Sequence, residues 1–242
     1  MVSKSQLKYI QSLGQKKYRD EGGVFVAEGP KLVRELIETH VELTHVYALD
    51  EWIEENKVFL KSINPTAISE TELERMSQLK TPNKVIAIVK KFEVNEPSIK
   101  ERISLALDTI RDPGNLGTII RIADWFGISQ IICSADCADM YNSKVVQATM
   151  GSIARVNVFY TDLPEWLKQR SDVRIYAAML EGKDVTKMSR IKEGLIIIGN
   201  ESIGIDKEVL QYSNEQIAIP RKGSAESLNA AVATGIILSH LV

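Results

Sequence analysis

The chain has few of the residues that bind metals or form disulfides. Its 242 residues include only two cysteines and three histidines. Cys133 and Cys137 lie close together in the sequence, but His40, His45 and His240 supply no matching pair at the spacing of a zinc site. The sequence therefore predicts no metal site, and we interpret the cysteines as reduced thiols without a shared role.

Long apolar segments are also missing. Residues 1–6 have no apolar run after their lysine, so they do not resemble a secretory signal. The most apolar segment, residues 230–242, is interrupted by Thr234, Ser239 and His240 and is too short to span a bilayer. We therefore expect a cytoplasmic protein.

Charge of one sign does not dominate the chain. The net charge of −2 argues against a surface that binds polyanions everywhere, although it permits a local basic patch. Such a patch occurs in the first 34 residues, which contain Lys4, Lys8, Lys16, Lys17, Arg19, Lys31 and Arg34 against Asp20, Glu21 and Glu28. From charge alone, a solvated helix face is the simpler interpretation, and a surface that contacts phosphates is the alternative.

The first 90 residues alternate between helical and strand patterns. The spacing of Leu7, Ile10 and Leu13 predicts a helix over residues 3–20, with Ser3 as its N-cap. Short strands and helices follow up to residue 90, which indicates a small α/β domain over 1–90. Residues 91–103 are charged and contain a proline, so they are the expected linker.

The segment 104–242 predicts a second, larger α/β domain. Strands are expected at 104–108, 130–133, 156–159, 174–178, 194–198 and 216–219, and helices at about 116–126, 143–150, 163–169, 207–212 and 227–241. The strand at 194–198 is apolar almost throughout, as in a parallel sheet that is covered on both faces. In such sheets ligands bind beyond the carboxyl ends of the strands.

Three polar loops follow strands of this second domain. The first, 112–115, is a turn that leads into a helix, with Asn115 as a candidate cap and Arg121 on the second turn. The second, 199–204, has glycines at both ends that permit a close backbone approach. The third, 219–229, joins a short strand to a helix of small residues. Neither a dinucleotide-binding nor a P-loop signature is present in the sequence.

Together the three loops resemble the signature motifs of the SpoU (TrmH-type) RNA 2′-O-ribose methyltransferases, within the SPOUT superfamily. The motifs correspond to residues 112–127, 198–204 and 219–233. The resemblance covers about 105–242 closely. Residues 1–90 are more loosely similar to the α/β RNA-binding domain that often precedes the methyltransferase domain in this family.

The resemblance implies a fold, a cofactor and a partner. It implies a parallel-sheet SPOUT domain with a deep trefoil knot, a homodimer and S-adenosylmethionine as the methyl donor. Carried over residue by residue, the cofactor-binding positions are Gly199, Asn200, Gly204, Ile219 and Leu228. The RNA substrate that it implies is ribosomal RNA first and transfer RNA second.

The same resemblance places five side chains in or near a catalytic centre: Asn115, Arg121, Glu201, Ser227 and Asn229. A guanidinium stays protonated at ordinary pH, so we hypothesise that Arg121 binds RNA phosphate and stabilises a developing alkoxide. A role for Arg121 as the general base is the alternative. Asn115 and Glu201 are expected to orient Arg121 and its loop.

The third motif departs from the family pattern. Ala230 and Ala231 stand where the family often has Val-Ser, and Arg221 and Ser202 also differ from the common residues. An RNA-binding or assembly module that keeps the cofactor pocket without turnover is therefore the alternative function. Cofactor binding without methyl transfer to any RNA would favour that alternative.

Overall fold

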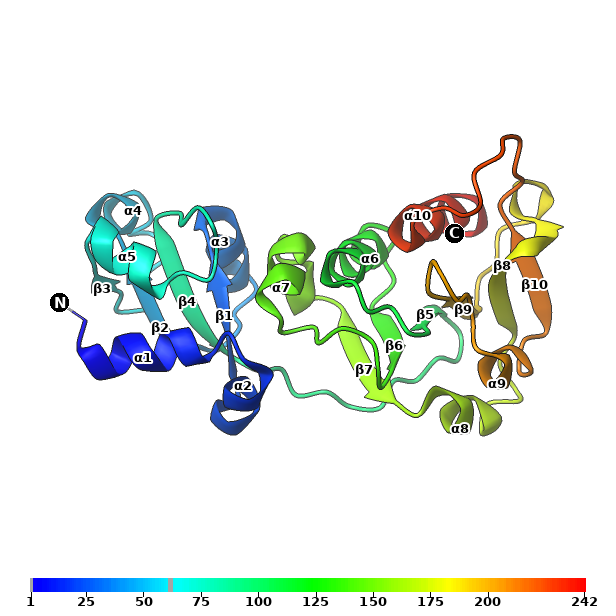
Figure 1. Ribbon diagram of the computed structural model, residues 1–242, viewed down its shortest axis with the longest axis horizontal. Helices are drawn as coiled ribbons and strands as arrows, with labels where there is room; N and C mark the ends of the chain where they lie inside the picture. The colour runs from blue at the N-terminus through cyan, green and yellow to red at the C-terminus, as the bar shows by residue number, and fades with distance from the viewer. Residues whose placement is uncertain (1, 61–62) are drawn as a thin grey trace. The chain divides into compact units, whose positions relative to one another are not determined.

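The computed structural model describes residues 2–60 and 63–242, and the chain forms two compact units (Figure 1). Unit 1 comprises the residues up to Glu93 together with Tyr141–Ala154. Unit 2 comprises Val94–Met140 and Arg155–Val242. Residues 141–154 thus belong to unit 1 by their contacts, although the sequence prediction included them in the methyltransferase domain. The boundaries of the functional domains stay a prediction.

Unit 1 is built on a four-stranded mixed sheet in the order β1-β4-β2-β3. The strands are β1 (Val24–Glu28), β2 (Leu43–Ala48), β3 (Thr66–Ala67) and β4 (Val85–Lys90). β4 runs antiparallel to β1 and β2, whereas β2 and β3 are parallel. Alternate residues point to opposite faces, so each face receives its own layer of helices.

The helices of unit 1 are α1 (Lys4–Ser12), α2 (Lys16–Gly22), α3 (Pro30–Glu38), α4 (Asp50–Glu55), α5 (Glu70–Met76) and α7 (Ser143–Thr149), with a 3₁₀ turn at Ser152–Ala154. Ile10 and Leu13 pack with α5 residues against one face of the sheet. Ser3 caps α1 as predicted, and its Oγ accepts a hydrogen bond from the Gln6 N–H. The prediction of one helix over 3–20 is wrong, because the chain turns after Leu13 and a second helix starts at Lys16.

Unit 2 contains a six-stranded sheet in the order β10-β8-β9-β5-β6-β7, in which every neighbouring pair is parallel. Its strands are β5 (Ile103–Leu107), β6 (Gln130–Ser134), β7 (Asn157–Thr161), β8 (Ile175–Asp184), β9 (Gly194–Ile198) and β10 (Glu215–Ala218). All five residues of β9 are buried, as the apolar pattern predicts. The parallel α/β class is confirmed, and the trefoil knot stays an expectation.

Helices cover both faces of this sheet (Figure 1). They are α6 (Pro113–Trp125), α8 (Leu163–Lys168), α9 (Lys207–Leu210) and α10 (Ala230–Leu241), with a 3₁₀ turn at Val185–Lys187. Residues of α8 and α9 pack in one core cluster with strand residues such as Ala106 and Leu195. α10 packs against α6, where Gly235 lies beside the Ile122 side chain. In the described part of the chain, no helix is long and apolar enough to cross a membrane.

Candidate functional site

The three polar loops meet at the carboxyl ends of the unit 2 strands. β5 leads into α6, β9 leads into α9, and β10 leads into α10. Because β9 and β5 are parallel neighbours, their carboxyl ends lie at the same edge of the sheet. The packing of α10 on α6 brings the third loop to the other two.

Three side chains join these loops in one hydrogen-bonded chain. The Asn115 Nδ2 donates to Glu201 Oε1, and the Asn229 Nδ2 donates to Asn115 Oδ1 at 2.7 Å. The Ala230 N–H also donates to Glu201 Oε1, at 3.3 Å. An ionised carboxylate only accepts hydrogen bonds, so Glu201 fixes which end of the Asn115 amide faces it. Asn115, Glu201 and Asn229, all named from the sequence, are therefore brought together.

The helices at this junction begin with side-chain caps. The Asp112 Oδ1 accepts from the Asn115 N–H at 2.8 Å and caps α6. The predicted cap at Asn115 is therefore wrong: Pro113 takes the first helical position, which places Asp112 at the N-cap. Asn229 caps α10, because its Oδ1 accepts from the Ala231 and Val232 N–H groups, at 3.0 and 3.2 Å. The expected helix over 227–241 consequently starts only at Ala230.

The second loop is a closed turn that depends on its glycines. Asn200 and Gly204 exchange two backbone hydrogen bonds, at 3.1 and 2.9 Å. A Cβ at Gly199 would lie 2.5 Å from the Gly204 carbonyl carbon, so no other residue fits there without opening the turn. Gly204 itself has φ +74°, a conformation that glycine adopts readily. The turn therefore requires glycine at both ends, as the sequence indicates.

The Asn200 side chain stabilises this turn from inside. Its Oδ1 accepts from the Ser202 N–H at 2.9 Å, and its Nδ2 donates to the Thr109 carbonyl at 2.9 Å. The amide thus connects the second loop to the end of β5. Any contact between Asn200 and a cofactor stays a prediction.

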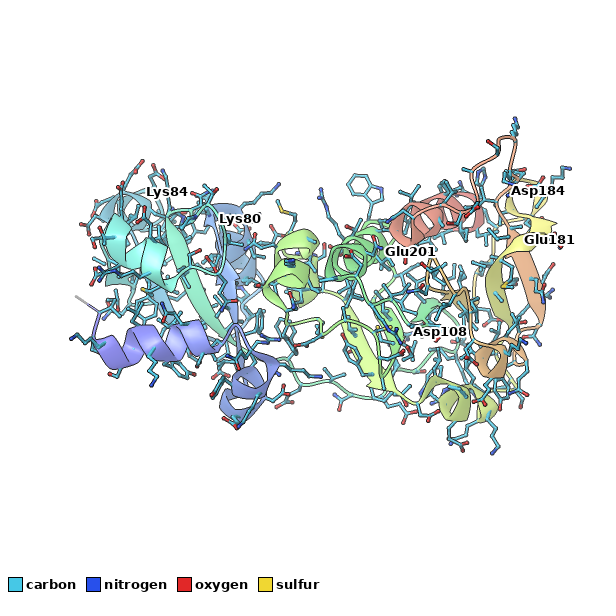
Figure 2. The ribbon with its side chains drawn as sticks, in the orientation of Figure 1. Lys80, Lys84, Asp108, Glu181, Asp184 and Glu201 are labelled. Carbon is cyan, nitrogen blue, oxygen red and sulfur yellow. The ribbon has the colours of Figure 1, made fainter. Side chains whose placement is uncertain are left out.

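A buried carboxylate beneath the loops escaped the sequence prediction. Asp108 follows β5 and is 3% exposed, and its Oδ2 accepts from the Asp206 N–H at 2.7 Å. Its Oδ1 accepts from the Thr109 hydroxyl at 3.1 Å. Burial raises the pKa of the Asp108 carboxyl, against the lowering effect of these hydrogen bonds. The signal in the sequence was an acidic residue directly after an apolar strand. Figure 2 labels Asp108 and Glu201 in this region.

Two predicted catalytic side chains lie outside the hydrogen-bonded junction. Arg121 is exposed on α6 and, within residues 2–60 and 63–242, has neither a hydrogen-bond nor an ion-pair partner. Ser227 is exposed in the third loop. The side chains of Asn115 and Glu201 form hydrogen bonds with each other and with the start of α10. These hydrogen bonds do not reach Arg121, so they provide no contact through which Asn115 and Glu201 orient it.

The backbone of the third loop offers unpaired donors. Residues 221–229 are all exposed, and within the described chain no hydrogen bond uses the N–H groups of 222–228. Of the two predicted contact positions, Leu228 lies within this stretch and Ile219 precedes it. Such a loop beside a carboxylate suits a small ligand that has both charged and hydrogen-bonding groups.

Other parts of unit 2 do not form a comparable site. A cavity of about 200 Å³ is lined by Val173, Arg174 and Gly194 at the amino ends of β8 and β9, which is the edge opposite to the loops. Cys133 and Cys137 are both buried and free. No group of three metal-binding side chains occurs among the residues that the structure describes.

Comparison with known proteins agrees with this geometry. A model of the SpoU rRNA Methylase family matches residues 102–239, and a model of the MRM3-like substrate binding domain matches residues 4–87. The 23S rRNA (guanosine(2553)-2′-O)-methyltransferase RlmP of Bacillus subtilis is 29% identical over 239 residues, covering 98% of this chain and 95% of the relative.

Solved structures match over the full length. A TrmH-family protein from Porphyromonas gingivalis has a TM-score of 0.87 and 32% sequence identity, over 99% of this chain and 98% of that chain. The AdoMet-bound rRNA methyltransferase from Sinorhizobium meliloti has a TM-score of 0.87 and 30% identity, over 99% and 95% of the two chains.

Proposed function

Since the chain belongs to the SpoU rRNA methylase family, we propose that it transfers a methyl group from S-adenosylmethionine to a ribose 2′-hydroxyl of structured RNA, with ribosomal RNA as the substrate. The observation that carries the proposal is the junction of Asn115, Glu201 and Asn229, which ties three loops of the family motifs to one another. The names of RlmP and the Sinorhizobium meliloti enzyme support the reaction and the substrate class.

The donor set of the site fits the cofactor. S-adenosylmethionine carries an amino acid end, a ribose and an adenine, all of which need hydrogen-bond partners. The unpaired N–H groups of 222–228 and the closed turn at 199–204 can provide them. When bound, the cofactor supplies an electrophilic methyl group on a sulfonium that is already a good leaving group.

Positioning is then the main task of the chain's own residues. Glu201 and Asn229 hold the second and third loops on α6, which keeps the reacting groups aligned for in-line attack. Among the described residues Arg121 has no hydrogen-bond or ion-pair partner, so its guanidinium can bind RNA phosphate and stabilise negative charge on the attacking oxygen. We propose this electrostatic role for Arg121, and not that of the general base.

A two-stage experiment tests the function. Calorimetric titration with S-adenosylmethionine is expected to show binding, and transcripts of 16S and 23S rRNA are expected to accept methyl groups at a ribose. Arg121→Ala should lower transfer by about 100-fold with cofactor affinity unchanged, and Arg121→Lys should restore only part of it. Binding of the cofactor without transfer to ribosomal or transfer RNA would refute the proposal.

One observation favours the alternative module without turnover. Ala230 and Ala231 are both buried at the start of α10, where the family often has a hydroxyl at the second position. A catalytic contribution from a hydroxyl at 231 is therefore absent. The same methyl-transfer assay separates the two functions, since only the enzyme labels RNA.

The outer faces of α6 and α10 support a homodimer through unit 2, which we propose together with a cytoplasmic location. Trp125 is 85% exposed on α6, and Val232 is 51% exposed on α10. Large apolar side chains on two adjacent helices are typical of protein contacts. Light scattering should give twice the mass of the chain, and Trp125→Glu should shift the distribution toward the monomer.

A further inference from the structure

The first two helices of unit 1 carry aromatic and basic side chains that the fold of this unit does not require. Tyr9 on α1 is 44% exposed, and Tyr18 on α2 is 38% exposed. Lys4, Lys8, Lys16 and Lys17 are exposed on the same two helices. We refer to these six residues as the helix-pair surface.

The lysines of this surface are largely free to bind a partner. In the described chain, Lys4 and Lys8 have no hydrogen bond or ion pair, and Lys16 only lies near Asp20. Lys17 has an exposed contact of 3.9 Å with Glu21 and lies 5.9 Å from the centroid of the Tyr18 ring. Exposed pairs of this kind contribute little to stability, so the lysine charges are available to an external anion.

A buried arginine of α2 forms hydrogen bonds with the end of α1. Arg19 is 2% exposed, and its Nη1 donates to the carbonyls of Leu13 and Gly14 at 2.9 Å each. These carbonyls follow the end of α1, where a cation is favourable. Tyr9 reaches the end of α2, because its hydroxyl would lie 3.3 Å from a Cβ at Gly22. The two helices that carry the tyrosines and lysines are thus held to each other.

The part of unit 1 that contains α4 and α5 has the opposite charge. Residues 3–23 contain five basic and two acidic residues, whereas residues 50–76, which include α4 and α5, contain three basic and seven acidic residues. A polyanion would therefore approach the helix pair and avoid α4 and α5. Tyrosine rings offer stacking faces to unpaired bases, and lysines bind the phosphates between them.

We infer that the helix-pair surface binds an unpaired segment of the RNA substrate by stacking on Tyr9 and Tyr18 and by phosphate contacts to the lysines. This inference rests on the proposed function for the identity of the RNA. It assigns RNA binding by unit 1 to one pair of helices, through stacking on tyrosine rings and phosphate contacts to lysines. The segment bound would be single-stranded, because only unstacked bases can reach the tyrosine rings.

Charge reversal in the full-length protein tests the phosphate contacts. The double variant Lys8→Glu/Lys16→Glu should bind 16S or 23S rRNA transcripts about 10-fold more weakly at moderate salt, and its binding should depend less steeply on salt. Lys16 is the first residue of α2, where an acidic side chain favours the helix, so this variant should fold. Lys57→Glu/Lys80→Glu is the matched control, with the same charge change at exposed positions of unit 1.

Stacking is tested separately at Tyr18. Tyr18→Ala should weaken RNA binding by about 5-fold or more, and Tyr18→Phe should keep wild-type affinity because the ring remains. S-adenosylmethionine affinity, measured by calorimetry, should be unchanged in all of these variants. It therefore reports whether unit 2 is intact.

Three outcomes would overturn the surface assignment: equal losses in the two charge-reversal variants, wild-type binding in the Lys8/Lys16 variant, or no retention of any transcript by the wild-type chain. Failure of the proposed function is distinguishable from these. In that case the wild-type protein binds transcripts through the helix pair but transfers methyl groups to none of them.

Discussion

In both units, a buried carboxylate at the end of a buried strand accepts hydrogen bonds from a loop that is distant in the sequence. In unit 1, Glu28 ends β1, and its carboxylate accepts from the Ser77 hydroxyl and, at 2.7 Å, from the Gln78 N–H. In unit 2, Asp108 follows β5 and accepts from the Asp206 N–H at 2.7 Å. A buried carboxylate that accepts hydrogen bonds therefore stabilises one loop in each unit.

The difference lies in the sheets around the two carboxylates. β4 runs antiparallel to β1, so the loop that Glu28 holds leads into the amino end of the neighbouring strand. In unit 2 every neighbouring pair is parallel, so the loops after β5 and β9 lie at one edge. A buried carboxylate thus becomes part of a candidate site only where strand direction gathers several polar loops around it.

The largest expected effect is at a glycine of unit 2. Gly199→Ala should destabilise the chain by about 3 kcal/mol and abolish cofactor binding, because the new Cβ would meet the Gly204 backbone. Gly23→Ala in unit 1 should cost only about 1 kcal/mol, since φ +61° is its sole obstacle. Urea denaturation and calorimetry measure both. Gly223→Ala, with open space around its Cβ, is the control within the candidate site.

Removal of the central carboxylate should lower activity more than stability. Glu201→Ala deletes the acceptor for the Asn115 side chain and the Ala230 N–H, so transfer should fall about 10- to 100-fold. Methyl transfer to rRNA transcripts is the assay, with the exposed Glu208→Ala as the matched control. Wild-type turnover in Glu201→Ala would show that the three loops do not depend on one another.

Alanine variants of the two buried carboxylates separate an effect on stability from an effect on cofactor binding. Glu28→Ala and Asp108→Ala each leave a loop N–H without its acceptor, so each should lower the free energy of unfolding by about 1–3 kcal/mol. Only Asp108→Ala should also weaken S-adenosylmethionine binding, by about 10-fold, because the Asp206 N–H that Asp108 accepts from lies directly after the second loop. A comparable loss of cofactor affinity in Glu28→Ala would contradict the division of labour between the units.

The smallest effect concerns pH. Burial raises the pKa of both carboxyl groups, Glu28 and Asp108, above their values of 4.5 and 3.8 in the unfolded chain. Each therefore contributes stability that is fully present below the unfolded pKa and is lost as pH rises through the folded pKa. Glu28→Gln and Asp108→Asn should gain stability relative to the wild type as pH rises above these unfolded values. Urea denaturation across this range checks the sign, and a parallel pH dependence in variant and wild type would contradict it.

Local patterns in the sequence predicted local structure well. The capping of α1 by Ser3 is confirmed, with its Oγ accepting from the Gln6 N–H. One error occurred where two neighbouring residues competed for one role. Asp112 and Asn115 are both good N-caps, and the position of Pro113 decided between them. The turn between α1 and α2 was missed because Leu13 continues the apolar spacing of α1.

The sequence by itself determined the alternation of strands and helices, the buried parallel strands and the identities of the loop residues, because these depend on neighbours along the chain. Only the tertiary structure decided that Asn115 and Asn229, which are 114 residues apart, share a hydrogen bond and that Glu201 accepts from both loops. It also decided that Asp108 lies beneath them. The physical reason is the strand order, since the pairing of β9 with β5 and the packing of α10 on α6 are set by burial of whole faces and not by any local pattern.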